Sequence, residues 1–327
     1  RAGAHGPLPS AAASVTRAAM SSRPAMPPPA LAGLLERLAP ETRGALGMVV
    51  ATFFFITMDS FAKGLGEHLP PMMVVWARYL SQTALLIVVF APSLRRRLVT
   101  AAPGLQLLRG VLLFTVTALF FFALAVLPLA EAIALVQVGP LFITALAAMV
   151  LAEKVGPRRW IAVVIGLLGA LLIVRPGLAV FQPAALLALA AAFCFASFQV
   201  LTRYLGSAEA IWTTMLWTSI VGLLMASAAL PWTWVAPPAA ALPGMALVGA
   251  AGLVGHAIFV WAMTQAAASV LAPFNYLSLF WATLAGLVIF GEVPEAMTLL
   301  GAAVIVVAGL YVWHRERRAV RPPSGLG

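Results

Sequence analysis

Ten apolar runs follow one another along this chain, and each is close to the length that crosses a lipid bilayer. A helix needs about 20 apolar residues to span a hydrocarbon core of about 30 Å, because it rises about 1.5 Å per residue. The runs are 45–65, 70–92, 104–126, 129–151, 159–175, 184–204, 211–230, 243–265, 269–290 and 297–313. The pattern predicts an all-α integral membrane protein with ten transmembrane helices.

Composition favours the same class over a soluble fold. The chain is 63% hydrophobic and 9% charged, with a mean hydropathy of +1.02. Soluble domains are about half apolar and about a quarter charged. Its single cysteine, Cys194, excludes an internal disulfide and a cysteine-based metal site, and we expect it to be an ordinary apolar helix residue. No metal or cofactor is expected.

The net charge of +10 comes from basic residues in short bursts between the apolar runs. Examples are Arg95–Arg97, Lys154 with Arg158 and Arg159, and Arg315 with Arg317 and Arg318. Such bursts are typical of cytoplasmic loops, so we predict both termini in the cytoplasm and no nucleic-acid partner. We interpret 1–44 as a disordered cytoplasmic tail, and 315–327 as a basic cytoplasmic tail.

Two glutamates reveal an internal repeat. Glu153 and Glu292 each end an apolar run, and residues 123–153 align with 262–292 without a gap. Identical or similar pairs are Ala123/Ala262, Thr144/Thr283, Gly110/Gly249, Lys63/Arg203, Gly66/Gly206 and Gly169/Gly309. The chain therefore divides into two five-helix repeats, 45–176 and 183–314.

Because five is odd, the second repeat must enter the membrane from the opposite side. The two halves are then related by a pseudo-two-fold axis in the membrane plane. Such inverted repeats place a site near the midplane and allow alternating access by rocking of one half against the other. This arrangement indicates a secondary transporter.

Three stretches resemble the drug/metabolite transporter superfamily, in particular its EamA type. They are LRGVLLF (108–114), LPLAEAIALVQVGPLFITALAAMVLAEKVGPRRW (127–160) and LAPFNYLSLFWATLAGLVIFGEVPEAMTLLGAAVIV (271–306). The resemblance covers about 45–314 and implies ten helices around a central substrate cavity. The LRG and APFNY segments are similar to bacterial uptake proteins for S-adenosylmethionine or riboflavin. Other members of similar appearance export amino acids.

Charged residues inside the spans are candidates for function, because each costs about 2.5–3.5 kcal/mol at a helix centre. Asp59 and Lys63 are four residues apart, so either they form a structural pair near the interface, with Lys63 snorkelling, or Asp59 is a cavity acid that binds a cation or cycles a proton. For Arg78, we expect a contact with Asp59 or with a substrate carboxylate or phosphate. Arg109 is either a cytoplasmic anchor or part of the family-like LRG segment.

Uncharged and neutral polar groups supply further candidates. His256 is either a hydrogen-bonded interior residue or a proton-coupling group. We expect Gln137, Asn275 and Tyr276 to contact the cavity, with interhelical hydrogen bonding as the alternative. The mid-span prolines Pro140 and Pro273 interrupt the backbone near them. Tyr79 and Trp281 are expected to stack on a flat ligand.

We interpret Glu153 and Glu292 as structural residues rather than chemical groups. Each ends a span at the membrane edge, where it can accept hydrogen bonds from the start of the next helix. No nucleophile or histidine lies near either of them in the sequence.

The predicted function is therefore a secondary carrier for a small polar or amphiphilic metabolite in the bacterial inner membrane. No G-x-x-x-x-G-K-[ST] loop is present for ATP. The competing classes are a membrane-embedded enzyme, which lacks an HExxH, a GxSxG or an acid pair here, and a scaffold, which gives no reason for the duplication. Expected partners are the substrate and the lipid bilayer. The glycines Gly169 and Gly309 favour close helix packing, within one chain or in a homodimer.

Overall fold

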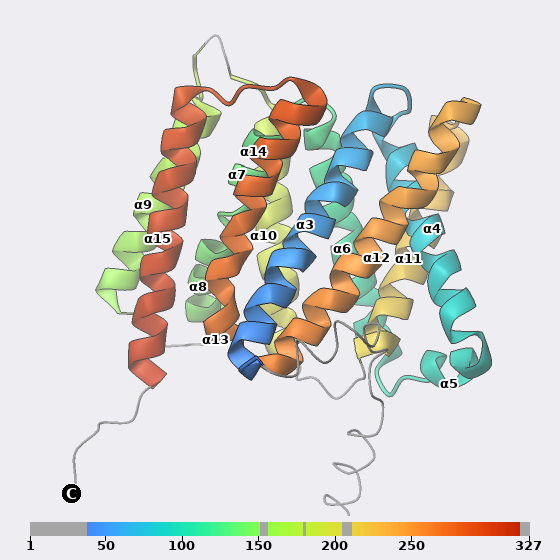
Figure 1. The fold of residues 1–327 in the computed structure, drawn as a ribbon, viewed down its shortest axis with the longest axis horizontal. Coiled ribbons are helices and arrows are strands. Elements are labelled where there is room, and N and C mark those ends of the chain that lie inside the picture. The colour runs from blue at the N-terminus through green and yellow to red at the C-terminus, as the bar shows by residue number, and fades with distance from the viewer. Residues whose placement is uncertain (1–37, 151–155, 179–180, 205–210, 321–327) are drawn as a thin grey trace, which may run out of the picture.

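The computed structural model describes residues 38–150, 156–178, 181–204 and 211–320, and the regular elements in these ranges are helices (Figure 1). In chain order they are α3 (Pro40–Gly66), α4 (Pro71–Phe90), η1 (Ala91–Ser93), α5 (Leu94–Leu98), α6 (Pro103–Leu124), α7 (Leu129–Val136), α8 (Gly139–Val150), α9 (Pro157–Val174), α10 (Ala184–Tyr204), α11 (Ile211–Thr233), η2 (Ala239–Ala241), α12 (Leu242–Gln265), α13 (Ala268–Leu271), η3 (Ala272–Tyr276), α14 (Leu277–Phe290) and α15 (Ala296–Val320).

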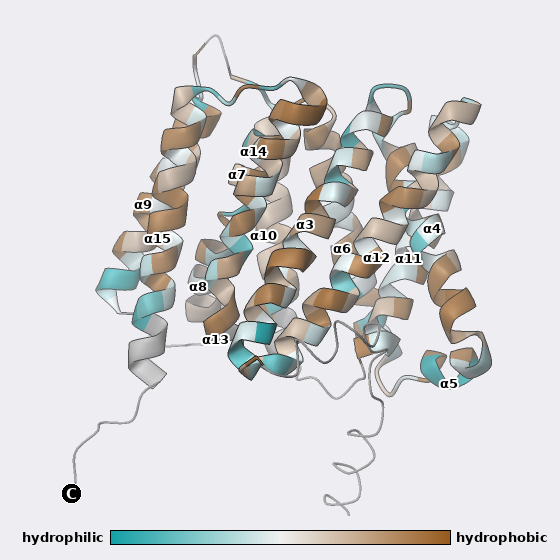
Figure 2. Ribbon diagram, viewed as in Figure 1, coloured by the Kyte–Doolittle hydropathy of each residue, from teal (hydrophilic) through white to brown (hydrophobic). Residues whose placement is uncertain are grey.

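Within those ranges, nine helical segments are long and apolar enough to cross a membrane, and α10 contributes a shorter apolar stretch, Ala184–Val200. The predicted all-helical class is therefore confirmed. Figure 2 shows hydrophobic residues along the middle of the helices and hydrophilic residues gathered at helix ends and in α5. Hydrocarbon offers no water to backbone groups, so helices that satisfy their own N–H and C=O groups are the stable form there.

The helix ends extend the predicted spans. α3 begins at Pro40, five residues before the predicted run, and α15 continues to Val320. Proline also opens α4, α6 and α9. The first N–H of a helix has no partner inside the helix, so proline is tolerated at this position and its fixed φ is suited to it.

Helix packing follows the predicted two-fold relation between the repeats. α3 packs on α12 and α6 packs on α10, whereas α4 packs on α11, α9 on α15, and α7 on α14. Exchanging the two repeats turns α3 into α10, α6 into α12, α4 into α11 and α9 into α15. Each packing pair is then converted into another pair or into itself. In Figure 1, α9 and α15 lie at one edge of the bundle, and α4 and α11 lie towards the other.

The chain has two membrane sides, which we name by the ends of the helices. The termini side is where α3 begins and α15 ends, and it carries α5 (Figure 1). The far side carries the α3–α4, α9–α10 and α14–α15 connections.

A row of glycines brings α12 unusually close to α3 and α4. A Cβ atom on Gly249 would lie 2.5 Å from the backbone oxygen of Arg78 and would also meet the Ser81 hydroxyl. One turn on, a Cβ on Gly252 would lie 2.8 Å from the sulfur of Met58. This close approach places polar residues of α3, α4 and α12 next to one another.

The two glycines that suggested close packing in the sequence contact their own chain. Gly169 of α9 lies against α15, with the Gly301 carbonyl oxygen 3.0 Å from its ideal Cβ position. Gly309 of α15 lies against the hydroxyl of Tyr276. Close packing within one chain therefore explains both glycines.

We expect Gly249→Ala to destabilise the protein by about 1–3 kcal/mol, because a Cβ there meets the backbone of α4, which cannot rotate away. Thermal unfolding of the detergent-purified protein measures the effect. Gly104→Ala in α6 is the matched control, since nothing lies within 4 Å of its ideal Cβ. Equal unfolding temperatures for the two variants would contradict this account of the glycine row.

Candidate functional site

Arg78 is buried seven residues into α4, and its guanidinium is held by uncharged groups. Nη1 donates to Thr117 Oγ1 at 2.8 Å, and Nε donates to Met58 Sδ at 3.3 Å. The Tyr79 hydroxyl lies 3.1 Å from the same Thr117 oxygen, which itself donates to the Leu113 carbonyl. A hydroxyl has one donor and two acceptor positions, so Thr117 accepts from both Arg78 and Tyr79. This network orients the guanidinium without neutralising it.

Asp59 of α3 is also buried, and it forms neither of the predicted ion pairs. Among the described residues, no contact within 4 Å joins it to Arg78 or to Lys63, and its Oδ1 has no hydrogen-bond partner. Arg78 nevertheless lies near Asp59, because its Nε donates to Met58, the residue directly before Asp59 in α3. Thr117 and Met58 bind the Arg78 guanidinium instead, and Lys63 pairs with Glu292 near the end of α3. The predicted contacts of Asp59 are therefore wrong, and the carboxylate keeps an unused acceptor.

His256 of α12 forms a hydrogen bond inside its own helix. Its Nδ1 lies 3.0 Å from the Gly252 carbonyl oxygen, and its ring meets the edge of Phe55 with centroids 4.9 Å apart. A carbonyl oxygen only accepts, so Nδ1 carries a proton, and in a neutral ring Nε2 remains as an acceptor. The ideal Cβ position of Gly252 lies 2.8 Å from the sulfur of Met58, which Arg78 also contacts. The three ionisable groups therefore belong to one neighbourhood of α3, α4 and α12.

The fourth and ninth spans are both interrupted in their first half. α7 ends at Val136 and α8 begins at Gly139, directly before Pro140. Proline has no N–H, so the Val136 carbonyl lacks its usual helical donor. In the ninth span, Pro273 lies in the 3₁₀ segment η3, between α13 and α14. Irregular backbone at this depth is tolerated where it lies inside protein or lines a water-filled cavity.

The two interruptions meet. Gln137, which follows α7, donates from Nε2 to the backbone oxygen of Asn275 in η3 at 3.3 Å. Asn275 is exposed and Tyr276 is half-buried. Gln137 and Tyr276 are equivalent in the repeat, so the contact lies close to the pseudo-two-fold axis. The predicted trio Gln137, Asn275 and Tyr276 is thus brought to one place.

Trp281 lies about one turn beyond this contact on α14. Its ring meets Phe53 of α3 edge-to-face at 5.4 Å, and its buried Nε1 has no partner. An indole N–H without a partner in an apolar bundle is costly, so a ligand acceptor is favoured there. Tyr79, in contrast, uses its hydroxyl in the Arg78 network and is fully buried.

Lys63 and Glu292 form a polar junction at the far side. The Lys63 Nζ lies 2.8 Å from Glu292 Oε1 and donates to the Leu127 carbonyl at 2.7 Å. The other carboxylate oxygen, Oε2, accepts from the backbone N–H of Leu129 at 2.8 Å. We predicted that Glu292 would accept from the next helix, α15, but it instead accepts from the start of α7 in the other repeat. Glu153 lies outside the described residues.

Gly291 sets the direction of the Glu292 side chain. It ends α14 with a φ of 66°, which glycine adopts without strain, and the N–H of Glu292 returns to the Gly286 carbonyl at 2.8 Å. The chain therefore turns sharply back towards α7 instead of continuing outwards. In the sequence, this turn corresponds to Phe290-Gly291-Glu292 at the end of the ninth apolar run.

Several residues of the site escaped the sequence analysis. Thr117 joins Arg78 to Tyr79, and Gln82 of α4 donates to the Ser219 hydroxyl at 2.9 Å while its Oε1 has no partner. Polar residues inside an apolar run were the available signal for both. Arg109 is buried within α6 rather than exposed at the membrane surface.

These side chains offer buried guanidinium groups, a buried acid with a free acceptor, an imidazole, amide groups and an indole. They can bind the charged and polar parts of a small molecule and stack on a flat one. Among the described residues, no three histidine, cysteine, aspartate or glutamate side chains are grouped to hold a metal ion.

The proteins that this chain is similar to include three transporters. The S-adenosylmethionine uptake transporter of Rickettsia bellii is 26% identical over 262 residues, covering 80% of this chain and 90% of the relative. The riboflavin transporter of Vibrio cholerae is 33% identical over 295 residues, covering 85% and 95%. The pseudopaline exporter of Pseudomonas aeruginosa is 29% identical over 272 residues, covering 81% and 94%.

A solved crystal structure shares the fold with a TM-score of 0.59 at 21% identity, covering 86% of this chain and 99% of that one. The model of the EamA-like transporter family matches residues 42–175 and again residues 182–313, which together make up most of the chain. Two matches in tandem agree with the duplication seen in the helix packing. The chain is thus a transporter rather than an enzyme, and it belongs to the EamA-like transporter family.

Proposed function

We propose that this chain is a secondary carrier that moves a small polar metabolite with a planar ring across the bacterial inner membrane by alternating access. The observation that carries the proposal is the contact of Gln137 with Asn275, where two interrupted spans of opposite repeats meet near the membrane centre. In inverted-repeat carriers, substrate sites lie at such a place, because freed polar groups there can face a ligand.

The substrate class follows from the groups around this contact. Amide groups of Gln137 and Asn275 and the hydroxyl of Tyr276 suit the hydroxyl and amide edges of a metabolite. Trp281 suits a flat ring, because aromatic faces stack on planar heterocycles. S-adenosylmethionine and riboflavin, which the similar carriers are named for, both join a planar nitrogen heterocycle to a hydroxylated sugar or sugar-alcohol group.

We assign the binding of charged substrate groups to Arg78 and the ionisable residues near it. Arg78 keeps its charge while Thr117 and Met58 orient it, so it suits a carboxylate or phosphate of the substrate. Asp59 and His256 offer acceptors to a cationic group or to a coupling proton. Ionisable groups inside a span are costly, and pairing with a substrate or ion accounts for their presence.

The orientation follows from the basic residues. Arg95–Arg97 lie in α5 on the termini side, and Arg158 and Arg159 open α9 there, whereas Arg175 lies on the far side. The positive-inside rule then favours a cytoplasmic termini side and a periplasmic far side. A homodimer stays a prediction.

We expect purified protein in proteoliposomes to take up one member of a labelled panel, comprising S-adenosylmethionine, riboflavin and amino acids, with saturable kinetics and no chemical change. Empty liposomes and unlabelled competitor are the controls. Absence of saturable flux with a metabolite carrying a planar ring, together with flux of a simple amino acid, would contradict the proposed substrate class.

Gln137→Ala is expected to lower uptake about tenfold, mainly through a higher KM, because the amide that reaches the ninth span is lost while the helices remain. Initial rates over a range of substrate concentrations separate KM from maximal velocity. Gln182→Ala, in the connection before α10, is the matched control and should transport normally. Equal KM values for the two variants would remove Gln137 from the binding site.

Arg78→Lys should reduce uptake of an anionic or zwitterionic substrate about tenfold or more, since an ammonium cannot reproduce the planar fork of a guanidinium. Arg96→Lys, at an exposed position in α5, provides the matched control. Normal transport by Arg78→Lys would show that Arg78 does not bind an anion through two parallel hydrogen bonds.

A further inference from the structure

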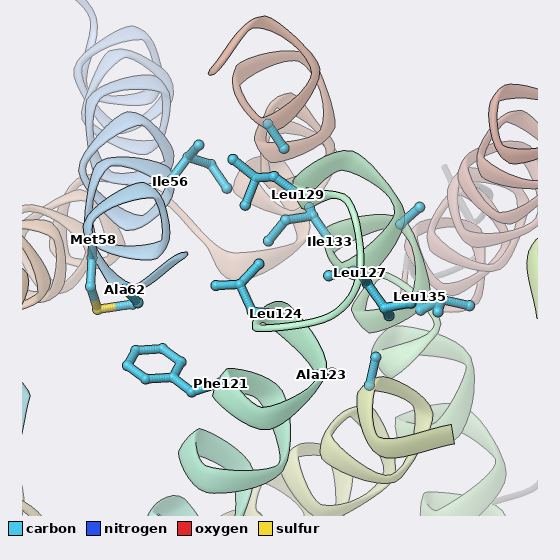
Figure 3. Packing of buried hydrophobic residues seen from close by; sticks show 14 of the residues in the cluster. Ile56, Met58, Ala62, Phe121, Ala123, Leu124, Leu127, Leu129, Ile133 and Leu135 are labelled. Atoms are coloured by element: carbon cyan, nitrogen blue, oxygen red, sulfur yellow. The ribbon is translucent and has the colours of Figure 1, made fainter. Parts of the chain in front are cut away.

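The far-side half of the bundle is closed by an apolar cluster. Figure 3 shows Ile56 of α3, Leu124 of α6, and Leu129 and Ile133 of α7 pointing towards one another. Each of these four side chains is at most 5% exposed. No pathway for a polar solute passes between α3, α6 and α7 in this arrangement.

The equivalent position in the other repeat is more exposed. Leu124 is 1% exposed and its repeat partner Met263 is 39% exposed. The tight apolar packing around Leu124 on the far side is therefore not matched around Met263 on the termini side.

Exposed polar side chains favour access of water to the termini-side half of the bundle. On the termini-side half, the amide side chains of Gln199 and Asn275 are exposed. Amide and hydroxyl groups facing hydrocarbon without partners are costly, which favours a water-filled opening around them. Asp59, the repeat partner of Gln199 on the closed side, is 5% exposed.

The junction of Lys63 with Glu292 lies directly beside the closed cluster. It joins three helices, because Lys63 belongs to α3, Leu127 and Leu129 lie at the start of α7, and Glu292 follows α14. The first three belong to one repeat and Glu292 to the other. Any far-side movement that separates the end of α14 from α3 and α7 must therefore break the two contacts of Glu292, with Lys63 and with the Leu129 N–H.

The junction is also accessible to water. Lys63 and Glu292 line a cavity of about 380 Å³ together with Glu67 and Phe290. Their side chains are 12% and 23% exposed. Water can thus replace the lost contacts when the junction opens, so the ion pair is suited to a reversible closure.

We propose that Lys63 and Glu292, with the backbone of Leu127 and Leu129, form the far-side gate of the transport pathway, which the structure holds closed. The proposal rests on the proposed carrier function, since a gate requires a pathway. It assigns to Glu292 a role in controlling access, in addition to joining the helices.

Cysteine labelling tests the gate without a substrate. In a Cys194→Ser background, Ile133→Cys places a reporter beneath the junction, and a membrane-impermeant maleimide is added from the far side. We expect Glu292→Gln to raise the labelling rate roughly three- to tenfold, because one partly exposed ion pair of the closed state is lost. The substitution keeps the side-chain length and an oxygen that can accept from Leu129. Lys63→Gln is the second variant and should act in the same direction.

Glu295→Gln is the matched control. It removes another far-side ion pair, Arg175 with Glu295 at 2.7 Å, which joins α9 to α15 at one edge of the bundle rather than α14 to α3 and α7. Labelling of the reporter should stay at the starting rate. Unchanged labelling in both Glu292→Gln and Lys63→Gln, in protein that elutes as the folded species, would overturn the gate. Raised labelling in protein that takes up no metabolite of the panel would show that the ion pair controls access from the far side although the proposed carrier function fails.

A cross-link supplies the opposite test. Lys63→Cys with Glu292→Cys, bridged by a short reducible bifunctional reagent, should stop uptake, and reduction should restore it. The pair Arg175→Cys with Glu295→Cys, bridged in the same way, should leave uptake largely intact. Continued uptake by the first bridged protein would show that the junction does not need to open.

Discussion

A polar group in the hydrocarbon core of a bilayer has no water to bind, so it needs a partner within the protein or in a water-filled cavity. Most backbone groups of this chain meet the requirement inside regular helices. The exceptions gather where α7 gives way to α8 and where η3 interrupts the ninth span. These two places are in contact through Gln137 and Asn275. The same constraint therefore produces both the helical bundle and the location of its candidate site.

Side-chain polar groups obey the constraint in two ways. Arg78 is held by Thr117 and Met58, and Lys63 by Glu292 and the Leu127 carbonyl. Asp59 Oδ1 and Trp281 Nε1, by contrast, are buried without partners. Satisfied groups stabilise one arrangement of helices, while the unsatisfied ones are available to a substrate or an ion. Polar groups with partners thus stabilise the fold, and in the proposed carrier the groups without partners bind the substrate or an ion.

The two repeats pack alike, but equivalent residues in them differ in how deeply they are buried. Packing pairs such as α3 with α12 and α6 with α10 repeat across the pseudo-two-fold axis. Burial does not repeat in the same way, since Leu124 is 1% exposed and Met263 is 39% exposed. A chain whose halves can exchange these environments has two arrangements of similar energy, which is the physical requirement for alternating access.

Much of the fold could be predicted because hydrocarbon thickness limits helix length. The ten apolar runs and the spacing of the repeated glutamates indicated the bundle and its duplication. The site was harder to predict. The spacing of Asp59 and Lys63 shows that they share a helix face, but Glu292 and the Leu127 carbonyl compete for the lysine from distant parts of the sequence. Likewise, nothing in the apolar run around Thr117 indicated that it would accept from Arg78.

The sequence by itself determined that this chain is a helical membrane protein built from two inverted repeats, because apolar length and repeat spacing are local properties that the bilayer converts directly into spans. Its resemblance to transporters of one family was visible for the same reason. Only the tertiary structure decided which polar groups found partners, that Glu292 reaches α7 rather than α15, and that the far side is closed. Those outcomes depend on distances between helices that are remote in the sequence, and residue order does not specify such distances.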